Sequence, residues 1–410
     1  MHVIIAGGGI GGLTAALCLH RAGIEVTVYE QAREMRALGL GINVQAGAVR
    51  VLSALGLEPA LSARAIETRE LIYMNRHGQE IWRDPRGRFA DLPWPQFSIH
   101  RGELQLVLLQ AVVERLGKDR VRTGSRLLSF TQDADNVQAR FVDANDNPVE
   151  TVTADILIGA DGIHSTVRGN FHPNEGPPKW NGVIMWRGIT LAKPFLSGAS
   201  MVWAGHSSQK FVCYPIGPNQ LNWICDLKVN DPTMLKREDW NRPGNLADFL
   251  PRYEDWRFPF LNVPEIIRGA SAIHEFPMVD RDPLPAWSHG RVSLLGDAAH
   301  PMYPIGSNGA SQSIFDAESL AEELKQSDPV AALKRYEQRR LPSTARIIES
   351  NRRQGIDVMM DIVEQRAPDG FTDLEKILPQ TELDTIVADY KRLALQDKES
   401  LLRLAANGAR

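Results

Sequence analysis

Hydrophobic residues near the start of the chain fall into two kinds of pattern. Residues 3–6 are all apolar, which is typical of a strand buried on both faces. A glycine-rich turn follows at residues 7–12, and the mostly apolar run at 13–20 is long enough for a helix. A second apolar strand, residues 25–29, ends at Glu30. The order strand, turn, helix, strand predicts a βαβ unit with a parallel sheet.

Helical spacing of apolar residues recurs later in the chain. Residues 103–116 carry apolar positions three or four residues apart, and we expect further helices over 309–326 and from 330 onward. The tail from 383 to 404 repeats the helical spacing between charged residues and predicts one packing helix. A helix that binds a partner is the alternative for this tail.

Alternation at a period of two marks the middle of the chain. It is clearest at residues 183–186, 211–214 and 221–224, and most of the nine tryptophans lie between 180 and 256. Such alternation predicts strands, and aromatic residues usually fill the core of a sheet. The apolar character of the first domain returns at residues 291–295. We therefore expect a second, mainly antiparallel domain inserted into the first.

The turn at residues 7–12 carries the glycine pattern of a dinucleotide-binding loop. In such a loop Gly7 makes the tight turn, Gly9 lets the backbone approach a pyrophosphate, and Gly12 allows the helix to pack on the strand. The phosphates then lie against the positive end of the helix. Glu30 follows about 20 residues later, where an acidic side chain accepts ribose hydroxyls. The motif predicts a bound dinucleotide rather than a glycine turn that serves packing alone.

Composition narrows the class of protein. With 50 acidic and 46 basic residues and a net charge of −4, the 410-residue chain has no excess of positive charge for nucleic acid. Its three cysteines, Cys18, Cys213 and Cys225, are scattered, and its ten histidines form no metal-binding motif. The uncharged stretch 2–20 has no basic flank or cleavage site. We expect no metal site, no membrane span and a cytoplasmic location.

Three further motifs stand at the ends of predicted strands or the start of a predicted helix. Asp161 follows a strand in the run Gly-Ala-Asp-Gly, and Asp297 follows another in the run Gly-Asp-Ala-Ala-His. Residues 304–312 form a glycine-bearing turn that opens a helix containing Asp316. Taken singly, each has a purely structural explanation, because aspartate commonly caps a helix at such a turn.

Together with the glycine turn, these motifs resemble the single-component FAD-dependent aromatic hydroxylases, whose fold is that of para-hydroxybenzoate hydroxylase. The resemblance covers about residues 1–350. Within this family, residues 185–188, 276–283 and 302–304 are most similar to the 5-methylphenazine-1-carboxylate 1-monooxygenases. Residues 306–309, Gly-Ser-Asn-Gly, depart from the Gly-Gln-Gly-x-Asn of many relatives. We therefore expect contacts from backbone amides there rather than from a side chain.

The resemblance implies a fold and a division of the chain. The fold is α/β, with a Rossmann-type FAD-binding domain (GR2-like), interrupted by a mainly antiparallel β substrate domain and followed by C-terminal helices. The FAD-binding domain would comprise residues 1–70, 98–178 and 272–350. The substrate domain would comprise residues 71–97 and 179–271, which leaves 351–410 as the C-terminal helical region.

The resemblance also implies which residues hold the adenosine half of FAD. The pyrophosphate would lie on the glycine turn, formed by Gly7, Gly9, Gly11 and Gly12. Glu30 would accept hydrogen bonds from the adenosine ribose. Arg101 would lie along the phosphates, a role that suits the forked donors of a guanidinium. The alternative for Arg101 is a surface ion pair with Glu103.

Other motif residues would face the flavin half. Asp297 would accept hydrogen bonds from the ribityl hydroxyls, and Asp161 would lie near both FAD and the incoming nicotinamide. Backbone amides of Gly306, Asn308 and Gly309 would meet the pyrimidine edge of the flavin, where a helix start stabilises negative charge.

The implied activity is FAD-dependent, NAD(P)H-consuming hydroxylation of an aromatic or heteroaromatic small molecule. In the family, NADH or NADPH reduces a tightly but non-covalently bound FAD, O2 adds to give a flavin C4a-hydroperoxide, and one oxygen atom passes to the ring. Because the chain has one dinucleotide fingerprint, NAD(P)H would bind transiently. A monomer or homodimer is expected.

Pocket residues are predicted only from the preference of planar ligands for aromatic walls. The candidates are Trp186, Trp203, Phe211, Tyr214, Tyr303 and Pro304. No catalytic base is nominated, and a structural role is the alternative for Tyr214. Two other functions stay open: an FAD oxidase or dehydrogenase reduced by its own substrate, and a non-catalytic protein on a related fold that binds no flavin.

Overall fold

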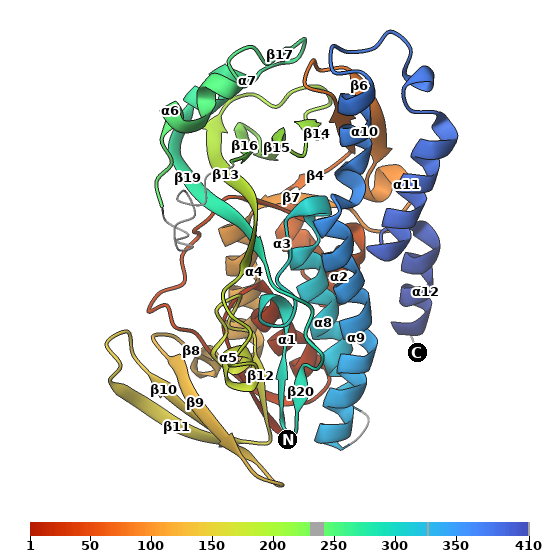
Figure 1. The fold of residues 1–410 in the computed structure, drawn as a ribbon. Coiled ribbons are helices and arrows are strands. Elements are labelled where there is room, and N and C mark those ends of the chain that lie inside the picture. Colours follow the sequence, from red (N-terminus) through yellow and green to blue (C-terminus); the bar gives the residue numbers. More distant parts are fainter. Residues whose placement is uncertain (230–241, 326–327, 409–410) are drawn as a thin grey trace.

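The computed structural model describes residues 1–229, 242–325 and 328–408, whose arrangement is shown in Figure 1. One sheet lies near the N-terminus, and a larger sheet lies at the other end of the molecule. The long helices α8 (Gly309–Leu324) and α9 (Pro329–Arg352) run alongside the first sheet and point toward the second.

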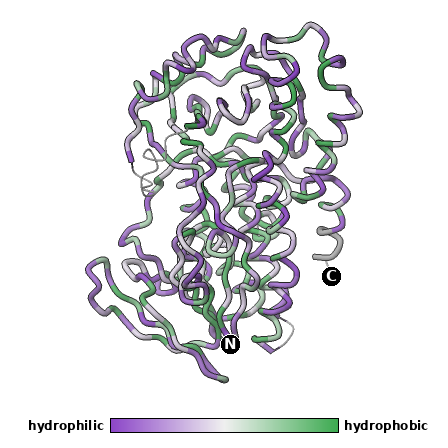
Figure 2. Tube along the Cα trace, in the orientation of Figure 1, coloured by the Kyte–Doolittle hydropathy of each residue, from purple (hydrophilic) through white to green (hydrophobic). Residues whose placement is uncertain are grey.

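Within the described residues, six strands form the first sheet, in the order β20-β21-β12-β1-β2-β8. Their bounds are β1 (His2–Ala6), β2 (Glu25–Tyr29), β8 (Val121–Arg122), β12 (Ile156–Gly159), β20 (Ser288–His289) and β21 (Val292–Leu294). The pairs along β21-β12-β1-β2-β8 are parallel, whereas β20 pairs antiparallel with β21. Figure 2 shows the central strands largely in the green of hydrophobic residues. The predicted βαβ unit and the return of the chain to this sheet are confirmed.

Helices pack against the first sheet through apolar side chains. Helix α1 (Ile10–Arg21) contacts α8 and α4 (Arg101–Leu116), and its residues from Leu13 to Leu19 are buried. Three shorter helices are α2 (Ala46–Ala54), α3 (Glu58–Ser62) and α5 (Thr166–Phe171). The predicted helix over 103–116 is confirmed, as are those that begin near 309 and 330, although Gln326 lies outside the described residues.

Two smaller sheets accompany the first. One has the order β11-β10-β9 and contains β9 (Arg126–Gln132), β10 (Val137–Val142) and β11 (Pro148–Ala154), which project from one side in Figure 1. The other has the order β3-β7-β4 and contains β3 (Gly41–Val44), β4 (Ile66–Glu67) and β7 (Phe97–His100). Because β7 runs directly into α4, it fixes Arg101 at the start of that helix.

Seven strands of the described residues form the second sheet, in the order β19-β13-β16-β15-β14-β5-β6. Their bounds are β5 (Glu70–Met74), β6 (Glu80–Pro85), β13 (Lys179–Leu191), β14 (Ser200–His206), β15 (Gln209–Gly217), β16 (Gln220–Lys228) and β19 (Ala270–Asp280). All neighbours are antiparallel except β14 and β5. The expectation of a mainly antiparallel sheet is confirmed.

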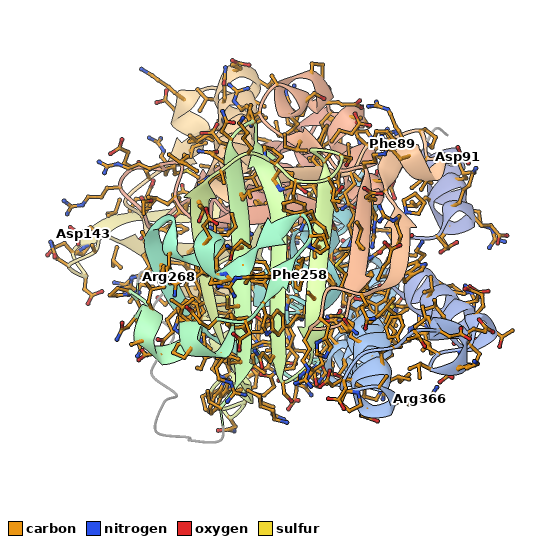
Figure 3. All side chains as sticks on the ribbon, turned by 90° about the horizontal axis from the view of Figure 1, so that it is seen from above. Phe89, Asp91, Asp143, Phe258, Arg268 and Arg366 are labelled. Carbon is orange, nitrogen blue, oxygen red and sulfur yellow. The ribbon has the colours of Figure 1, made fainter. Side chains whose placement is uncertain are left out.

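One face of the second sheet is covered by short elements. They are α6 (Leu246–Phe249), α7 (Val263–Arg268), β17 (Arg257–Phe258) and β18 (Leu261–Asn262). Figure 3 shows this cover lying across the strands, with Phe258 and Arg268 labelled. The described 3-10 turns outside the site are η1 (Gly87–Ala90), η2 (Lys118–Arg120), η4 (Leu250–Arg252), η7 (Gly355–Asp357) and η8 (Leu374–Lys376).

The two faces of the second sheet have different neighbours. On the covered face, which we call the outer face, Trp186 stacks on Phe249, and Phe211 lies against Tyr253. On the other, inner face, Trp203 packs among residues of the C-terminal helices. The tryptophans buried as predicted are Trp186, Trp203, Trp223 and Trp256. Trp180 is half-buried, and Trp240 lies outside the described residues.

The C-terminal residues form three helices, α10 (Val358–Arg366), α11 (Gln380–Leu393) and α12 (Lys398–Gly408). Helix α11 ends because Leu395 adopts a left-handed φ of 56°, and the Gln396 amide donates to the Lys391 carbonyl oxygen at 2.8 Å. The prediction of one helix over 383–404 is therefore wrong. Helix α11 packs on the inner face through Leu383 and Tyr390, beside α10, so the packing role is confirmed for this part of the segment.

Two expectations from composition can be compared with the structure. Cys18, Cys213 and Cys225 are buried and free. Among the helices of the described ranges, none has both the length and the apolar character needed to cross a membrane.

Candidate functional site

The turn between β1 and α1 has no room for a side chain at two of its glycines. Gly7 has a φ of +112°, and a Cβ there would lie 2.2 Å from the Ala160 carbonyl oxygen. A Cβ on Gly12 would lie 2.0 Å from the Gly7 carbonyl oxygen, whereas a Cβ on Gly9 would meet no atom within 4 Å. The protein itself therefore requires glycine at two positions, and the space beside Gly9 is open for a ligand.

Glu30 lies at the end of β2 and faces this turn. Its Oε2 accepts a hydrogen bond from the Gly8 amide at 2.7 Å, and its Oε1 accepts one from the Ala32 amide at 2.8 Å. Gln105 of α4 donates to the Gly8 carbonyl oxygen at 2.8 Å. These bonds fix the carboxylate beside the glycine turn, at the place where a dinucleotide ribose would need an acceptor.

Arg101 is exposed at the start of α4. His100 caps this helix, because its Nδ1 accepts a hydrogen bond from the Gly102 amide at 3.2 Å. Glu103, the alternative partner predicted for Arg101, lies 3.5 Å from Arg64 instead. The Arg101 side chain runs past Gly39, where a Cβ would lie 3.7 Å from it. Arg101 is thus not committed to the predicted surface pair with Glu103.

Asp161 lies at the end of β12, next to the glycine turn. One carboxylate oxygen, Oδ2, accepts a hydrogen bond from the Thr166 amide at 2.7 Å and holds the start of α5. The other, Oδ1, is buried and has no hydrogen-bond partner within the described residues. Burial raises the pKa of this carboxyl, and hydrogen bonds from Ser165 and nearby amides oppose the shift. An acceptor left without a donor beside the open turn fits a ligand that carries hydroxyl or amide donors.

Asp297 lies in the short turn η5 (Gly296–Ala298) after β21. Its Oδ1 lies 4.0 Å from the position of a Cβ on Gly309, and a Cβ on Gly11 would lie 2.7 Å from Leu295. The structure thus brings the strand end at 295–297 next to the glycine turn, and brings the start of α8 next to Asp297. Asp297 is solvent-accessible, yet the dense protein around it limits hydration and raises its pKa, with His300 and Arg101 opposing. An exposed carboxylate at this position can accept hydrogen bonds from a ligand.

Buried charges hold the Gly296–Asp297 turn in place. Asp316 of α8 is fully buried, and its Oδ2 accepts from the Gly296 amide at 3.0 Å and from His300 at 2.5 Å. Its Oδ1 accepts from Arg340 of α9 at 2.7 Å. Burial alone would raise the pKa of Asp316, but His300 and Arg340 outweigh burial and lower that pKa to about 2. Sequence reasoning noted Asp316 in the helix without assigning it this role.

Replacing Asp316 by asparagine is expected to destabilise the fold by about 3–5 kcal/mol, because Arg340 loses its buried counter-charge. Since the folded pKa lies below the ordinary value of 3.8, the carboxylate contributes stability above pH 3.8, and this contribution is lost as pH falls toward 2. Denaturant unfolding at several pH values measures both effects. The exposed pair Arg366–Glu382 supplies the control, because Glu382→Gln should change stability little.

The loop 305–309 links Asp297 to α8 and turns sharply at Gly306, which has a φ of +70°. Gln45 Nε2 donates to the Gly306 carbonyl oxygen at 2.8 Å. Asn308 is fully buried, and its Nδ2 donates to the Tyr390 hydroxyl at 2.7 Å. Its side chain is therefore engaged within the protein, as the departure from the commoner family pattern led us to expect. The backbone amides of this loop remain the groups through which it could contact a ligand.

An apolar cluster joins the inner face of the second sheet to the loop after Asp297. Its members are Leu40, Val183, Met185, Phe276, Met278, Tyr303 and Ile305, and we call it the inner apolar cluster. It lies between the elements that carry the dinucleotide motifs and the strands β13 and β19. Such a surface suits a planar ligand next to a cofactor.

The six predicted pocket residues separate between the two faces. Tyr303 belongs to the inner apolar cluster, Pro304 beside it is exposed, and Trp203 and Tyr214 lie on the inner face. Trp203 also lines a small cavity with Gly306, Ser307 and Tyr390. In contrast, Trp186 and Phe211 are core residues of the outer face. The prediction is corrected for these last two, because neighbours in a strand point to opposite faces.

Arg187 is a candidate site residue that the sequence analysis did not single out. It follows Met185 on the inner face, and its Nη2 donates to the Gly41 carbonyl oxygen at 2.9 Å. Its Nε is buried and has no hydrogen-bond partner within the described ranges. Burial lowers the pKa of Arg187. Tyr214, which shares a hydrogen bond with Arg187, and Asp226 both act to raise it. Asp226 is itself paired with Lys210 at 3.2 Å. A half-buried cation with a spare donor therefore borders the inner apolar cluster.

Comparison with known proteins gives a consistent result. The FAD binding domain family matches residues 1–351. The chain is 47% identical over 361 residues to the phenazine 1,6-dicarboxylic acid hydroxylase PhzS of Lysobacter antibioticus, covering 85% of this chain and 89% of that protein. It is 31% identical over 354 residues to the 3-hydroxybenzoate 6-hydroxylase 1 of Aquipseudomonas alcaligenes, covering 84% and 86%.

Solved structures share the fold. HpxO of Klebsiella pneumoniae, complexed with FAD and uric acid, has a TM-score of 0.75 at 24% identity and covers 95% of this chain and 97% of that chain. A salicylate hydroxylase substrate complex has a TM-score of 0.73 at 22% identity, with coverage of 97% and 98%. The α/β fold, with an FAD-binding domain, an antiparallel sheet and C-terminal helices, is thereby confirmed. The chain belongs to the FAD binding domain family and is an FAD-dependent, NAD(P)H-consuming aromatic monooxygenase.

Proposed function

We propose that this monooxygenase hydroxylates a planar nitrogen heteroaromatic carboxylate of the phenazine class, with the substrate carboxylate on Arg187. The observation that carries the proposal is the half-buried Arg187 guanidinium, whose Nε has no hydrogen-bond partner within the described residues. A guanidinium presents forked donors that match a carboxylate. The 47% identical relative is named as a hydroxylase of phenazine 1,6-dicarboxylic acid, and that compound is a planar nitrogen heteroaromatic that carries carboxylates.

The surroundings of Arg187 support an aromatic substrate. Met185 and Phe276 lie on adjacent strands, and Tyr303 and Ile305 approach from the loop after Asp297. These side chains offer apolar walls to a ring system, while Arg187 and Tyr214 supply polar groups at one side. Burial raises the pKa of Tyr214 to about 12, so its phenol stays protonated and can donate a hydrogen bond at neutral pH.

The residues predicted to hold FAD are proposed for that role on the geometry given above. Gly9 would face the pyrophosphate, Glu30 the adenosine ribose and Arg101 the phosphates. Asp297 would accept from the ribityl chain, and Asp161 Oδ1 would take a donor from a ligand. When bound and reduced by NAD(P)H, FAD activates O2 for insertion of one oxygen atom into the ring. The apolar walls exclude water from that step.

We also propose that residues 1–70, 98–178 and 272–350 form the FAD-binding domain. The protein is proposed to be a monomer or a homodimer. A cytoplasmic location is proposed because the three cysteines are free, as in a reducing compartment.

The proposal predicts a specific pattern in a substrate panel. The purified yellow protein is mixed with NADH or NADPH and with phenazine carboxylates, uncarboxylated phenazine, quinolones or simple benzoates. We expect a carboxylated phenazine to accelerate nicotinamide oxidation the most and to gain one oxygen atom, with little hydrogen peroxide released. The carboxylate requirement is contradicted if uncarboxylated phenazine is hydroxylated equally well, and the substrate class is contradicted if only benzoates are hydroxylated.

A further inference from the structure

The loop 305–309 is held by side chains that come from outside it. Gly306 has a φ of +70°, and a Cβ there would lie 1.9 Å from the Tyr390 hydroxyl oxygen. Tyr390 belongs to α11, more than 80 residues along the chain, and is 4% exposed. The close approach shows that the loop backbone packs directly on this one side chain.

The Tyr390 hydroxyl is the meeting point of several hydrogen bonds. It accepts from Asn308 Nδ2 at 2.7 Å. As a donor it lies 3.2 Å from the Ile305 carbonyl oxygen and 3.3 Å from Asn351 Oδ1. Asn351 in turn donates through Nδ2 to the Tyr303 carbonyl oxygen at 3.1 Å. The hydroxyl therefore ties both ends of the loop to the end of α9.

The side-chain oxygen of Asn308, Oδ1, also accepts hydrogen bonds. Gln396 Nε2 donates to Asn308 Oδ1 at 3.2 Å, and Gln45 Nε2 lies 3.3 Å from the same atom. Gln396 reaches this position because α11 ends at Leu393 and the chain turns back through Leu395. The break in the tail, which the sequence pattern did not predict, thus serves to bring a second C-terminal side chain to the loop.

We infer that Tyr390 is a positioning residue for the flavin: through Asn308, it fixes the backbone of residues 305–309 so that its amides hold the flavin edge. This inference rests on the proposed position of the flavin at that loop. The family match ends at residue 351, so it does not reach the helix that supplies Tyr390. The C-terminal helices are then part of the cofactor site and not only a support for the second sheet.

Removing the hydroxyl has a defined physical consequence. In Tyr390→Phe, Asn308 Nδ2 keeps only the Ile305 carbonyl oxygen, at 3.3 Å, as an acceptor. A buried donor without a good partner is costly, so the loop shifts its population toward other arrangements. The ring of residue 390 still fills its place in the packing. We therefore expect a change that is local to the loop and to the flavin.

The test uses the holoenzyme of Tyr390→Phe beside Tyr253→Phe. Tyr253 is an equally buried tyrosine whose hydroxyl donates to the Lys210 and Asp226 carbonyl oxygens on the far side of the second sheet. We expect amide hydrogen exchange at residues 305–309 to be about tenfold faster in the first variant and unchanged in the second. The flavin absorption spectrum and the dissociation constant for FAD, titrated into apoprotein, should also change in the first variant alone.

Two outcomes would overturn the inference. One is unchanged exchange at 305–309 in Tyr390→Phe, and the other is an equal change in both variants, which would indicate a general loss of stability. If Tyr390→Phe does not fold, Gln396→Leu tests the same claim, because it removes the other C-terminal contact with Asn308. Exchange needs no substrate, so it stays informative if the phenazine proposal fails. A double variant with Asn308→Ala should show non-additive effects, since Tyr390 acts through Asn308.

Discussion

Replacing Arg187 by methionine is expected to lower kcat/KM for a carboxylated phenazine by about 10²–10³-fold, or about 3–4 kcal/mol. The reason is that the substrate carboxylate then meets the inner apolar cluster without its cationic partner. Most of the loss should appear as a higher KM. The carboxylate lies away from the reacting carbon, so Arg187 binds it equally in the ground state and in the transition state. Steady-state kinetics of the wild type and Arg187→Met with the same substrate measure it.

Two comparisons show whether Arg187 recognises the substrate carboxylate or only maintains the shape of the site. Arg187→Lys should recover part of the loss, since lysine keeps the charge but not the forked geometry. Uncarboxylated phenazine should be processed about equally by wild type and Arg187→Met, because it has no group for Arg187 to bind. If both substrates lose activity to the same extent in Arg187→Met, the side chain shapes the site and does not recognise the carboxylate.

Alanine at Gly12 and at Gly9 should have different consequences, although both glycines belong to one motif. A Cβ at position 12 would press on the Gly7 carbonyl oxygen at 2.0 Å, so Gly12→Ala should lower the Tm of the apoprotein and abolish FAD retention. A Cβ at position 9 meets no protein atom within 4 Å. Gly9→Ala should therefore leave the apoprotein Tm unchanged and weaken FAD binding by about 10–100-fold, because the added methyl takes space meant for the pyrophosphate.

Thermal unfolding of the apoproteins and fluorescence titration with FAD provide both readouts. Equal FAD affinity in wild type and Gly9→Ala would mean that the cofactor does not approach the backbone at Gly9. A lowered apoprotein Tm in Gly9→Ala would mean that the open space is closed in solution. Either result would contradict the proposed place of the pyrophosphate.

The parts of the fold that sequence predicted best are those with strong local signals. The strand, turn and helix around Gly7 follow from apolar runs and glycine spacing, because the turn geometry depends on residues close together in the chain. The tail was predicted less well. Its helical spacing continues across Leu395, and nothing local marks the left-handed turn there, since leucine seldom adopts that conformation.

The pocket was predicted less well than the cofactor loop, for a reason visible in β13. The aromatic ring of Trp186 predicts a place in the pocket wall, yet this side chain points to the outer face. Its neighbours Met185 and Arg187 point to the inner face. Alternation along the strand was available from the sequence. What could not be derived is which face looks toward the cofactor, because that depends on how the sheet packs on distant residues such as Tyr303.

Asn308 also shows the difference between what a local sequence pattern predicts and what depends on long-range packing. The departure from the commoner family pattern predicts contacts from backbone amides at the loop, and the structure shows only that the Asn308 side chain is engaged within the protein. The partner of its side chain, Tyr390, lies in a segment with no motif, and only tertiary packing brings it there. Long-range hydrogen bonds of this kind leave no periodic signal in a sequence.

The central claim, that this flavoprotein inserts one atom of O2 into a carboxylated heteroaromatic ring, is tested most directly with isotopically labelled dioxygen. The enzyme, NADH or NADPH, and a phenazine carboxylate are incubated under labelled O2, and the product mass is compared with that formed in labelled water. We expect one labelled oxygen atom in the ring product from O2 and none from water. An unlabelled product, or NAD(P)H-independent reduction of the flavin by the phenazine itself, would contradict the account.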